Sequence, residues 1–492
     1  MKVNFKLMMA CLAMMTVGLV GCTNEEGPGG PGGAGDNGAE GSIALTLVDG
    51  NTSVTRGAGS NAQAAVGNEI GIDWTNDLKV VIFENNNAVV NEMVKFEEVT
   101  PATTPKTYKS TKTFSLSAGN KYVYILANEA EANIPDPETA TSRIAWERSI
   151  KDVTITSSAP ATPGYLNIAP ATTNGFRIGT MWREMVTVLG TSTDVNPEVL
   201  GPISVGRAAA KVVLSSVAQQ AGTVNGLKGQ FTLPRYAVQS VAKKFYMVGQ
   251  YDGNLLPTNN GVYVTSAVHE KPAIKSDGSG GWVLNDADFM NYADNATELI
   301  AVGNVATNFF YVSENTTKKM DSPDGAYNNR QYFGNTTHIQ LETKYVPHAD
   351  EIYDAAQLPD LVLLSGGSSV ISSNGGTFYV AIAGDEGLSY IFAQDPSQAK
   401  PALYPTDDHR IKYTGGLNYY TFAVSDPNEA NDELKNRVLR NHYYDVSVTA
   451  INSLGDDSFI RKPEQPLPTT SIVEITVRIA DWNKITSPVV IP

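Results

Sequence analysis

The strongest constraint on the fold is an apolar alternation with a period of two residues. It is clearest near the C-terminus, where residues 473–480 read Val-Glu-Ile-Thr-Val-Arg-Ile-Ala. Successive side chains of a β-strand point to opposite faces, so this pattern describes one buried and one solvent-facing side. Similar short runs recur along the chain, among them Ile43–Leu47, Leu78–Phe83, Tyr122–Leu126, Lys211–Leu214, Phe309–Val312, His338–Leu341, Thr377–Ile382, Tyr419–Val424 and Tyr443–Ile451.

Helical signals are few. The best candidate runs from Pro427 to Arg440, with Asp426 as its cap and Pro427 at the first helical position, and residues 284–300 form a weaker one. Many short strands separated by turns, in a chain with 43 Gly and 26 Pro, predict an all-β protein built from β-sandwich domains with few short helices.

The N-terminus has the three parts of a secretory signal. Lys2 and Lys6 precede the apolar run Leu7–Val20, which is shorter than the roughly 20 residues that cross a bilayer. The residues Leu-Val-Gly-Cys at positions 19–22 resemble a bacterial lipobox, whose cysteine carries lipid after the signal is removed. We therefore predict a signal peptide over residues 1–21, lipidation at Cys22 and a flexible Gly- and Pro-rich tether over residues 27–41.

The cysteine content and the net charge limit the kinds of site and ligand that this chain can have. Cys11 and Cys22 are the two cysteines, so the exported fold has no thiol for a disulfide, a metal site or a nucleophile. The formal net charge of −15 disfavours binding to the phosphate backbone of nucleic acids.

Motifs for catalysis or cofactor binding are absent from the sequence. The five histidines contain no His-Glu-x-x-His pair, and the chain has no nucleophile elbow, phosphate-binding loop or dinucleotide fingerprint. Residues 286–288 and 321–324 begin like calcium loops but lack the required glycine and distal glutamate, which leaves only loose calcium binding open. We predict no catalytic residue, no cofactor and no metal site, and hence a protein that is not an enzyme.

Several stretches resemble the fimbrillins of Bacteroidales, the subunits of type V pili, and most of all the shaft subunits of minor fimbriae. The stretches are, in chain order, Leu78–Phe83, Gly119–Asn128, Val205–Val213, Phe310–Thr316, Arg437–Val448 and Val473–Trp482. Together with the lipobox, they extend over nearly the whole chain.

The resemblance implies a fold and a processing route. The fold is expected to be two transthyretin-like β-sandwich domains, over residues 57–202 and 203–492, after a tether and propeptide strand over residues 22–56. The precursor is expected to be an outer-membrane lipoprotein, and an arginine-specific protease to cut it between Arg56 and Gly57. The mature form is then expected in fimbriae on the cell surface.

The resemblance also implies assembly by strand exchange. In the precursor, Ile43, Leu45 and Leu47 are expected to fill an apolar groove as a self-donated strand, which leaves after cleavage. We expect the replacement to come from the C-terminus of another copy, over residues 485–492, where Ile485, Val489 and Ile491 supply the apolar side chains. Whether the strand predicted over Val473–Ile479 stays internal or also peels away is left open.

The resemblance implies the following partners: further copies of the chain in a head-to-tail polymer, fimbrial anchor and tip proteins, the maturation protease, and receptors on host or bacterial surfaces.

Two other interpretations of the function remain open. A monomeric surface lipoprotein that binds glycans would keep residues 22–56 and carry a platform of Tyr or Trp. A β-sandwich hydrolase would need a polar cleft with carboxylates whose pKa values are perturbed.

Overall fold

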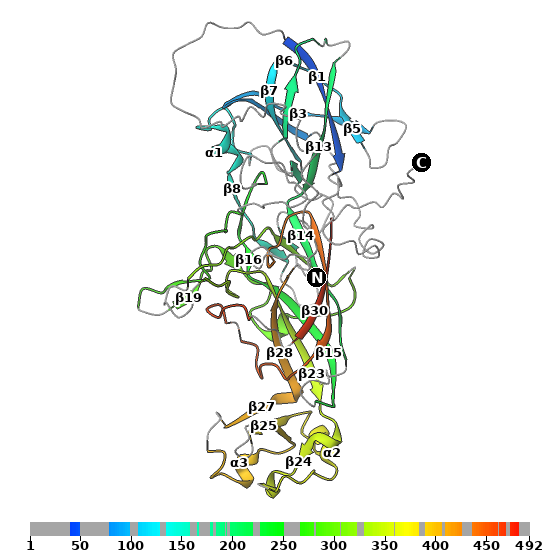
Figure 1. Ribbon diagram of the computed structural model, residues 1–492, viewed down its shortest axis with the longest axis vertical. Helices are drawn as coiled ribbons and strands as arrows, with labels where there is room; N and C mark the ends of the chain where they lie inside the picture. Colours follow the sequence, from blue (N-terminus) through cyan, green and yellow to red (C-terminus); the bar gives the residue numbers. More distant parts are fainter. Residues whose placement is uncertain are drawn as a thin grey trace, which may run out of the picture. The chain divides into compact units, whose positions relative to one another are not determined.

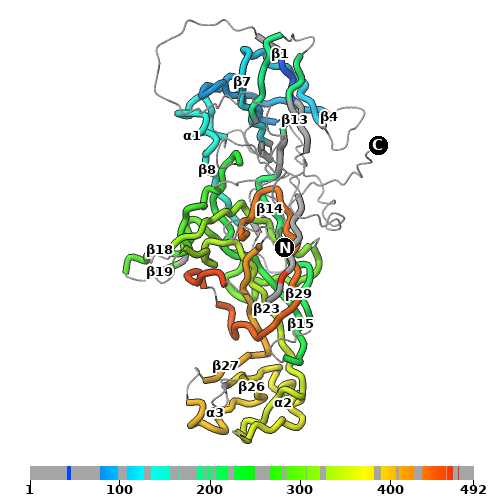
Figure 2. Tube along the Cα trace, in the orientation of Figure 1, coloured from blue at the N-terminus to red at the C-terminus, as the bar shows by residue number. Residues whose placement is uncertain are grey.

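The fold is described from a computed structural model, whose described residues are drawn in colour in Figure 1; Figure 2 shows the chain trace in the same orientation. They are residues 40–49, 78–98, 107–127, 134–157, 165–166, 178–180, 184–191, 193, 197–219, 227–249, 266–279, 282–305, 307–321, 329–358, 360–382, 389–405, 409–425, 435–460, 462–468 and 473–481.

The first half of the chain forms a ten-stranded sheet (Figure 1). Its hydrogen-bonded order is β3-β2-β7-β11-β13-β1-β5-β4, while β12 also pairs with β7 and β6 with β1. The strands are β1 (Glu40–Asp49), β2 (Leu78–Glu84), β3 (Asn87–Val94), β4 (Phe96–Glu98), β5 (Thr107–Ser110), β6 (Phe114–Ser117), β7 (Gly119–Ala127), β11 (Ile178–Thr180), β12 (Glu184–Val188) and β13 (Glu198–Arg207).

The two faces of this sheet bury different side chains. On β2 and β7, Val80, Ile82, Val123 and Ile125 join the main apolar core, as the period of two predicts. The alternate residues pack instead around Trp146, on the short helix α1 (Arg143–Glu147). Both faces of the central strands are therefore covered.

The second half of the chain forms a β-sandwich from two four-stranded sheets. The β14 sheet has the order β22-β14-β29-β30, and the β15 sheet the order β21-β15-β23-β28. Their apolar faces meet, and the ring of Tyr236 on β15 lies 5.3 Å from that of Phe310 on β22. The strands are β14 (Ala209–Val217), β15 (Gln230–Gln239), β21 (Ile300–Ala301), β22 (Phe310–Ser313), β23 (His338–Val346), β28 (Leu417–Ala423), β29 (His442–Ile451) and β30 (Val473–Asp481).

A smaller sheet is inserted between the paired strands β23 and β28 (Figure 1). Its order is β24-β26-β25-β27, from β24 (Ile352–Tyr353), β25 (Phe378–Ile382), β26 (Ser389–Phe392) and β27 (Arg410–Tyr413). The same insertion contains helices α2 (Gly367–Ser373) and α3 (Pro396–Ala399) and the 3-10 turns η5 (Ala349–Glu351), η6 (Ala355–Gln357) and η8 (Thr414–Gly416).

Four two-stranded pairs and one further 3-10 turn complete the described elements. The pairs are β8 (Ile150–Asp152) with β17 (Lys244–Tyr246), β9 (Ile155–Ser157) with β10 (Tyr165–Leu166), β16 (Val241–Ala242) with β20 (Phe289–Met290), and β18 (Ile274–Ser276) with β19 (Trp282–Leu284); the turn is η4 (Ala296–Glu298). None of the helices within the described residues is long and apolar enough to span a membrane.

The prediction of an all-β sandwich protein with few short helices is confirmed. Both helix candidates, however, are wrong where the structure describes them. Residues 435–440 of the first form turns, and Val438 bridges to Asn315 instead of continuing a helix. Residues 284–300 form strand ends and turns around η4. The predicted domain boundary at residues 202/203 falls within β13, whereas sheet membership changes at Ala208; the division into domains stays a prediction.

Candidate assembly site

The first strand of the fold lies inside the ten-stranded sheet, with hydrogen-bonded partners on both edges. Strand β1 pairs in parallel with β13, where Ile43 is opposite Glu198. On its other edge it pairs antiparallel with β6 over its first half and with β5 over its second half. We call β1 together with β5, β6 and β13 the β1 site. If β1 left this site, it would expose unpaired backbone groups on both sides of the gap.

The described side chains of β1, at residues 42–45, are buried on both faces of the sheet. Ile43 and Leu45 have 0% exposure, and they belong to the main core with Phe114 of β6 and Ile203 of β13. Ala44, on the opposite face, is 1% exposed. This is the geometry expected of an apolar strand that fills a groove, and it places two of the three predicted groove-filling residues in the core.

The pairing of β1 changes register once, next to the point where its antiparallel partner changes. The shift against β13 falls between Leu45 and Leu47. There the Leu45 amide donates a hydrogen bond to Ser110 Oγ at 3.0 Å, and that hydroxyl donates to the Lys112 carbonyl at 2.8 Å. A side chain from the end of β5 thus replaces a ladder hydrogen bond. The backbone of Leu47 pairs with Tyr108 and Ile203, and its side chain lies outside the described residues.

Most other predicted site residues lie outside the described residues. These are the lipidation site Cys22, the cleavage pair Arg56 and Gly57, and the donor residues Ile485, Val489 and Ile491. Their assignments stay predictions. In chain order, the predicted cut falls between β1 and β2, and the predicted donor follows β30.

Three of the stretches that carry the family resemblance come together around β14. Strand β14 contains part of the stretch Val205–Val213. It pairs antiparallel with β22, which contains part of Phe310–Thr316, and in parallel with β29, which contains part of Arg437–Val448. The Asn441 side chain accepts a hydrogen bond from the Arg207 amide at 3.1 Å. This meeting of distant segments could not be read from their spacing in the sequence.

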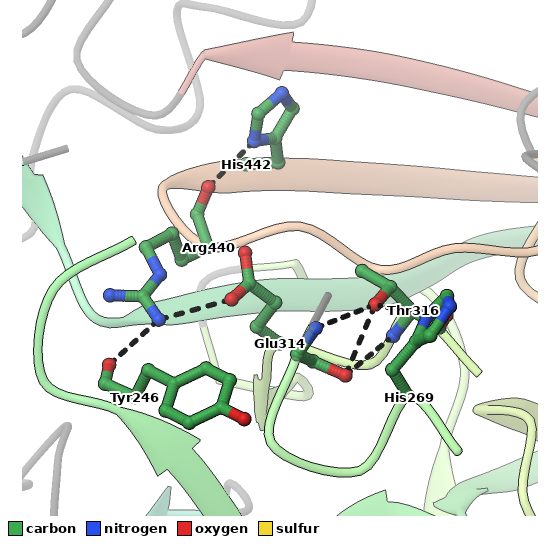
Figure 3. A network of polar contacts seen from close by, with 7 residues as sticks. Tyr246, His269, Glu314, Thr316, Arg440 and His442 are labelled. Atoms are coloured by element: carbon green, nitrogen blue, oxygen red, sulfur yellow. Dashed lines mark hydrogen bonds and ion pairs between the residues drawn. The ribbon is translucent and has the colours of Figure 1, made fainter. Parts of the chain in front are cut away.

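A buried ion pair joins two of these stretches. Arg440 Nη2 lies 3.0 Å from Glu314 Oε2, and the two side chains are 5% and 4% exposed. The same nitrogen donates to the Tyr246 carbonyl at 2.9 Å, which connects the pair to β17 (Figure 3). Removing one partner from such a pair leaves a buried charge without compensation, so the role of this pair is structural. The sequence analysis missed it because neither residue belongs to a recognisable motif.

Two histidines border this network in Figure 3 without forming a metal site. Nδ1 of His442 lies 2.7 Å from the Arg440 carbonyl, and Nδ1 of His269 lies 2.5 Å from the Thr316 carbonyl. Both rings therefore engage the backbone. Among the described residues, no group of three or more His, Cys, Asp or Glu could hold a metal ion.

Comparison with known protein families gives a match over residues 411–487. The matching family is described as the major fimbrial subunit protein type IV, fimbrillin, C-terminal. Residues 411–487 are thus similar to the C-terminal region of fimbrillins. The fimbrillin resemblance seen in the sequence is thereby confirmed, and the matched segment contains β28, β29 and β30.

Solved structures of fimbrial and adhesion proteins are similar over most of the chain, at low identity. A protein from Parabacteroides distasonis, proposed to act in cell adhesion, is 15% identical with a TM-score of 0.45, covering 90% of this chain and 100% of its own. The fimbrilin FimA of Porphyromonas gingivalis is 14% identical with a TM-score of 0.42, covering 90% and 99%. The tip fimbrial protein Mfa3 of the same species is 13% identical with a TM-score of 0.35, covering 90% and 100%. No curated protein matches the chain.

Proposed function

We propose that this chain is a structural subunit of a cell-surface fimbria, assembled by strand exchange after proteolysis, and that it supports adhesion without catalysis. The fimbrillin region at residues 411–487 supports the fimbrial assignment. The observation that carries the strand-exchange step is the position of β1. It is the first described strand, yet it lies in the middle of a sheet with both edges paired, and its side chains at residues 42–45 are buried on both faces.

In this proposal the precursor reaches the outer membrane as a lipoprotein anchored through Cys22. An arginine-specific protease cuts between Arg56 and Gly57, in the segment between β1 and β2. The cut separates β1 from the rest of the fold, so only non-covalent contacts then hold it. Burial of Ile43 and Leu45 contributes about 1.5–3 kcal/mol for each side chain, which keeps the precursor stable until a replacement strand is present.

The replacement strand comes from the C-terminal segment of another copy. Residues 485–492 follow β30 and carry Ile485, Val489 and Ile491. Extended chain spans at most about 3.3–3.6 Å per residue, so these eight residues can cover the length of β1 that pairs with β13. Because donor and groove are different surfaces, the contact is head-to-tail and leads to an open filament, to which anchor and tip proteins can add at the ends.

N-terminal sequencing of fimbriae sheared from cells tests the maturation step. We expect the polymerised protein to begin at Gly57. Polymer that begins at Cys22 with its lipid would contradict cleavage before assembly. Monomeric surface protein that keeps residues 22–56 would instead favour the glycan-binding lipoprotein.

A further inference from the structure

A cavity lies against the outer face of the β15 sheet, away from the core of the sandwich. Along β23, Ile339 and Leu341 point into the core, so His338, Gln340 and Glu342 belong to the other face. A polar face of this kind normally contacts solvent. Here, however, these three side chains are only 6%, 1% and 3% exposed. Another part of the protein therefore covers this polar face of the β15 sheet.

The cover is formed by two described stretches that lead from β29 towards β30, residues 453–460 and 462–468. Tyr419 of β28 exchanges two backbone hydrogen bonds with Asp456, both at 2.9 Å. Further along, the amides of Phe333 and Gly334 donate to the carbonyls of Gln465 at 3.1 Å and Pro463 at 3.0 Å. The two stretches are thus hydrogen-bonded to the body of the protein at both ends of the cavity, which makes the cavity preformed.

The cavity has a volume of about 490 Å³, within the range of about 300–1,000 Å³ that is typical of small-molecule sites. The residues that line it include the aromatic residues Phe333 and Tyr419 and the neutral polar residues Asn291, Thr421 and Gln465. Amides and hydroxyls both donate and accept hydrogen bonds, and they match a ligand whose own groups do the same.

The charged side chains of the lining offer little to an ionic ligand. Asp456 and Lys462 pair with each other, with Oδ1 and Nζ 2.8 Å apart. Burial lowers the pKa of His338 to about 4, so its ring is neutral at physiological pH. The cavity therefore presents rings, amides and hydroxyls with no net charge.

We propose that this cavity binds a neutral saccharide. Sugar hydroxyls both donate and accept hydrogen bonds, which suits the amide and hydroxyl groups, and the apolar C–H face of a sugar ring suits the aromatic rings. The site lies between the β15 sheet and residues 453–460 and 462–468, and it shares no residue with the β1 site. It would therefore give a subunit its own ligand contact that does not depend on strand exchange.

Binding of the purified, uncut full chain to an array of neutral, sialylated and sulfated oligosaccharides tests the proposal, with titration calorimetry on the best ligand. We expect a neutral oligosaccharide to bind. Thr421→Trp fills the cavity and abolishes binding. Gln465→Ala removes an exposed lining group and weakens binding by roughly tenfold. Glu464→Ala, next to it but outside the lining, leaves binding unchanged.

Circular dichroism establishes that each variant is folded, and Gln465→Ala still tests the site if Thr421→Trp does not fold. Absence of any neutral ligand, stronger binding of charged glycans, or binding unaffected by Gln465→Ala would overturn the proposal. So would displacement of the sugar by a proline-rich peptide, since the cavity would then be a peptide site. Because the uncut chain is used, failure of polymerisation cannot alter the result.

Discussion

Strands β1 and β14 occupy the same position in two different sheets. Each is the first strand of its sheet in chain order, with antiparallel pairing on one edge and parallel pairing on the other. These partners are β6 and β5 against β13 for β1, and β22 against β29 for β14. Each changes register once against its parallel partner, and each buries Leu side chains in the main core. Their local packing is therefore alike.

The difference between them is covalent. β14 follows β13 after the single residue Ala208, so it is linked directly to the sheet that contains β1. β1 is the first described strand, and the predicted cut at Arg56 lies between it and β2. Under the proposed strand exchange, one position holds a permanent strand in one sheet and an exchangeable strand in the other. The comparison then teaches that connectivity, rather than packing, would determine which strand can be replaced.

The largest expected effect comes from blocking the cut. In Arg56→Ala, β1 keeps its covalent link and should stay in its groove as β14 does, so cells should display lipidated monomers without fimbriae. Electron microscopy and immunoblots of sheared material measure this. Arg148→Ala, at an exposed arginine, is the control and should leave fimbriae normal. Fimbriae of ordinary length in Arg56→Ala would remove the proposed distinction between the two strands.

Deletion of residues 485–492 should abolish self-polymerisation while the subunit remains folded and cleaved. Such a subunit has a groove but no donor segment. It can therefore bind the C-terminal segment of a wild-type copy but cannot donate one to the next subunit. Added in small amounts to wild-type subunits, it should shorten the filaments, as light scattering and microscopy can measure. If the truncated subunit alone forms intact polymers, the donor lies elsewhere, with β30 the next candidate.

Matched truncations should separate the two strands by their effect on stability. Leu45→Ala on β1 and Leu214→Ala on β14 each empty a buried site and should lower the free energy of unfolding of the uncut chain by about 2–5 kcal/mol. In the polymer, only Leu214→Ala should remain destabilising, because β1 has left. Chemical denaturation of both forms measures this. Equal destabilisation of the polymer by Leu45→Ala would mean that β1 is retained.

The smallest expected effect is a pH dependence of stability that comes from a residue of β14 and has no counterpart on β1. Burial lowers the pKa of Lys211 from its ordinary 10.5 to about 7, and its ammonium lies 4.0 Å from the centre of the Phe309 ring. Between these two values the unfolded chain binds a proton that the folded chain lacks, so this residue makes stability rise with pH. Denaturant titrations should therefore show that Lys211→Met raises the free energy of unfolding by more at pH 7 than at pH 9. This gain over the wild-type chain should fall by about 1–3 kcal/mol between the two pH values. A difference that does not vary with pH would contradict the lowered pKa.

Sequence patterns predicted strands well where the alternation was regular and both faces had a clear role. The run at residues 473–480 lies in β30, and the run Tyr122–Leu126 lies in β7. The helix predicted over Pro427–Arg440 failed in its described part, although Asp426 and Pro427 are good start signals. Its apolar face was thin, and pairing of Val438 with Asn315 replaced the local preference. Of the candidate assembly site, the apolar residues Ile43 and Leu45 were predicted, whereas their partners on β13 were not.

By itself, the sequence determined that this chain is all-β, that it has no cysteine after Cys22, and that the apolar run Ile43–Leu47 suits a groove. These properties depend on residues close together or on composition. The tertiary structure alone decided that β1 lies between β13 and β6, that the stretches around β14 meet, and that a polar sheet face is covered by residues 453–460 and 462–468. A strand can pair with many others of similar pattern, so the choice of partner depends on contacts between residues far apart in the chain, such as Ile43 with Glu198.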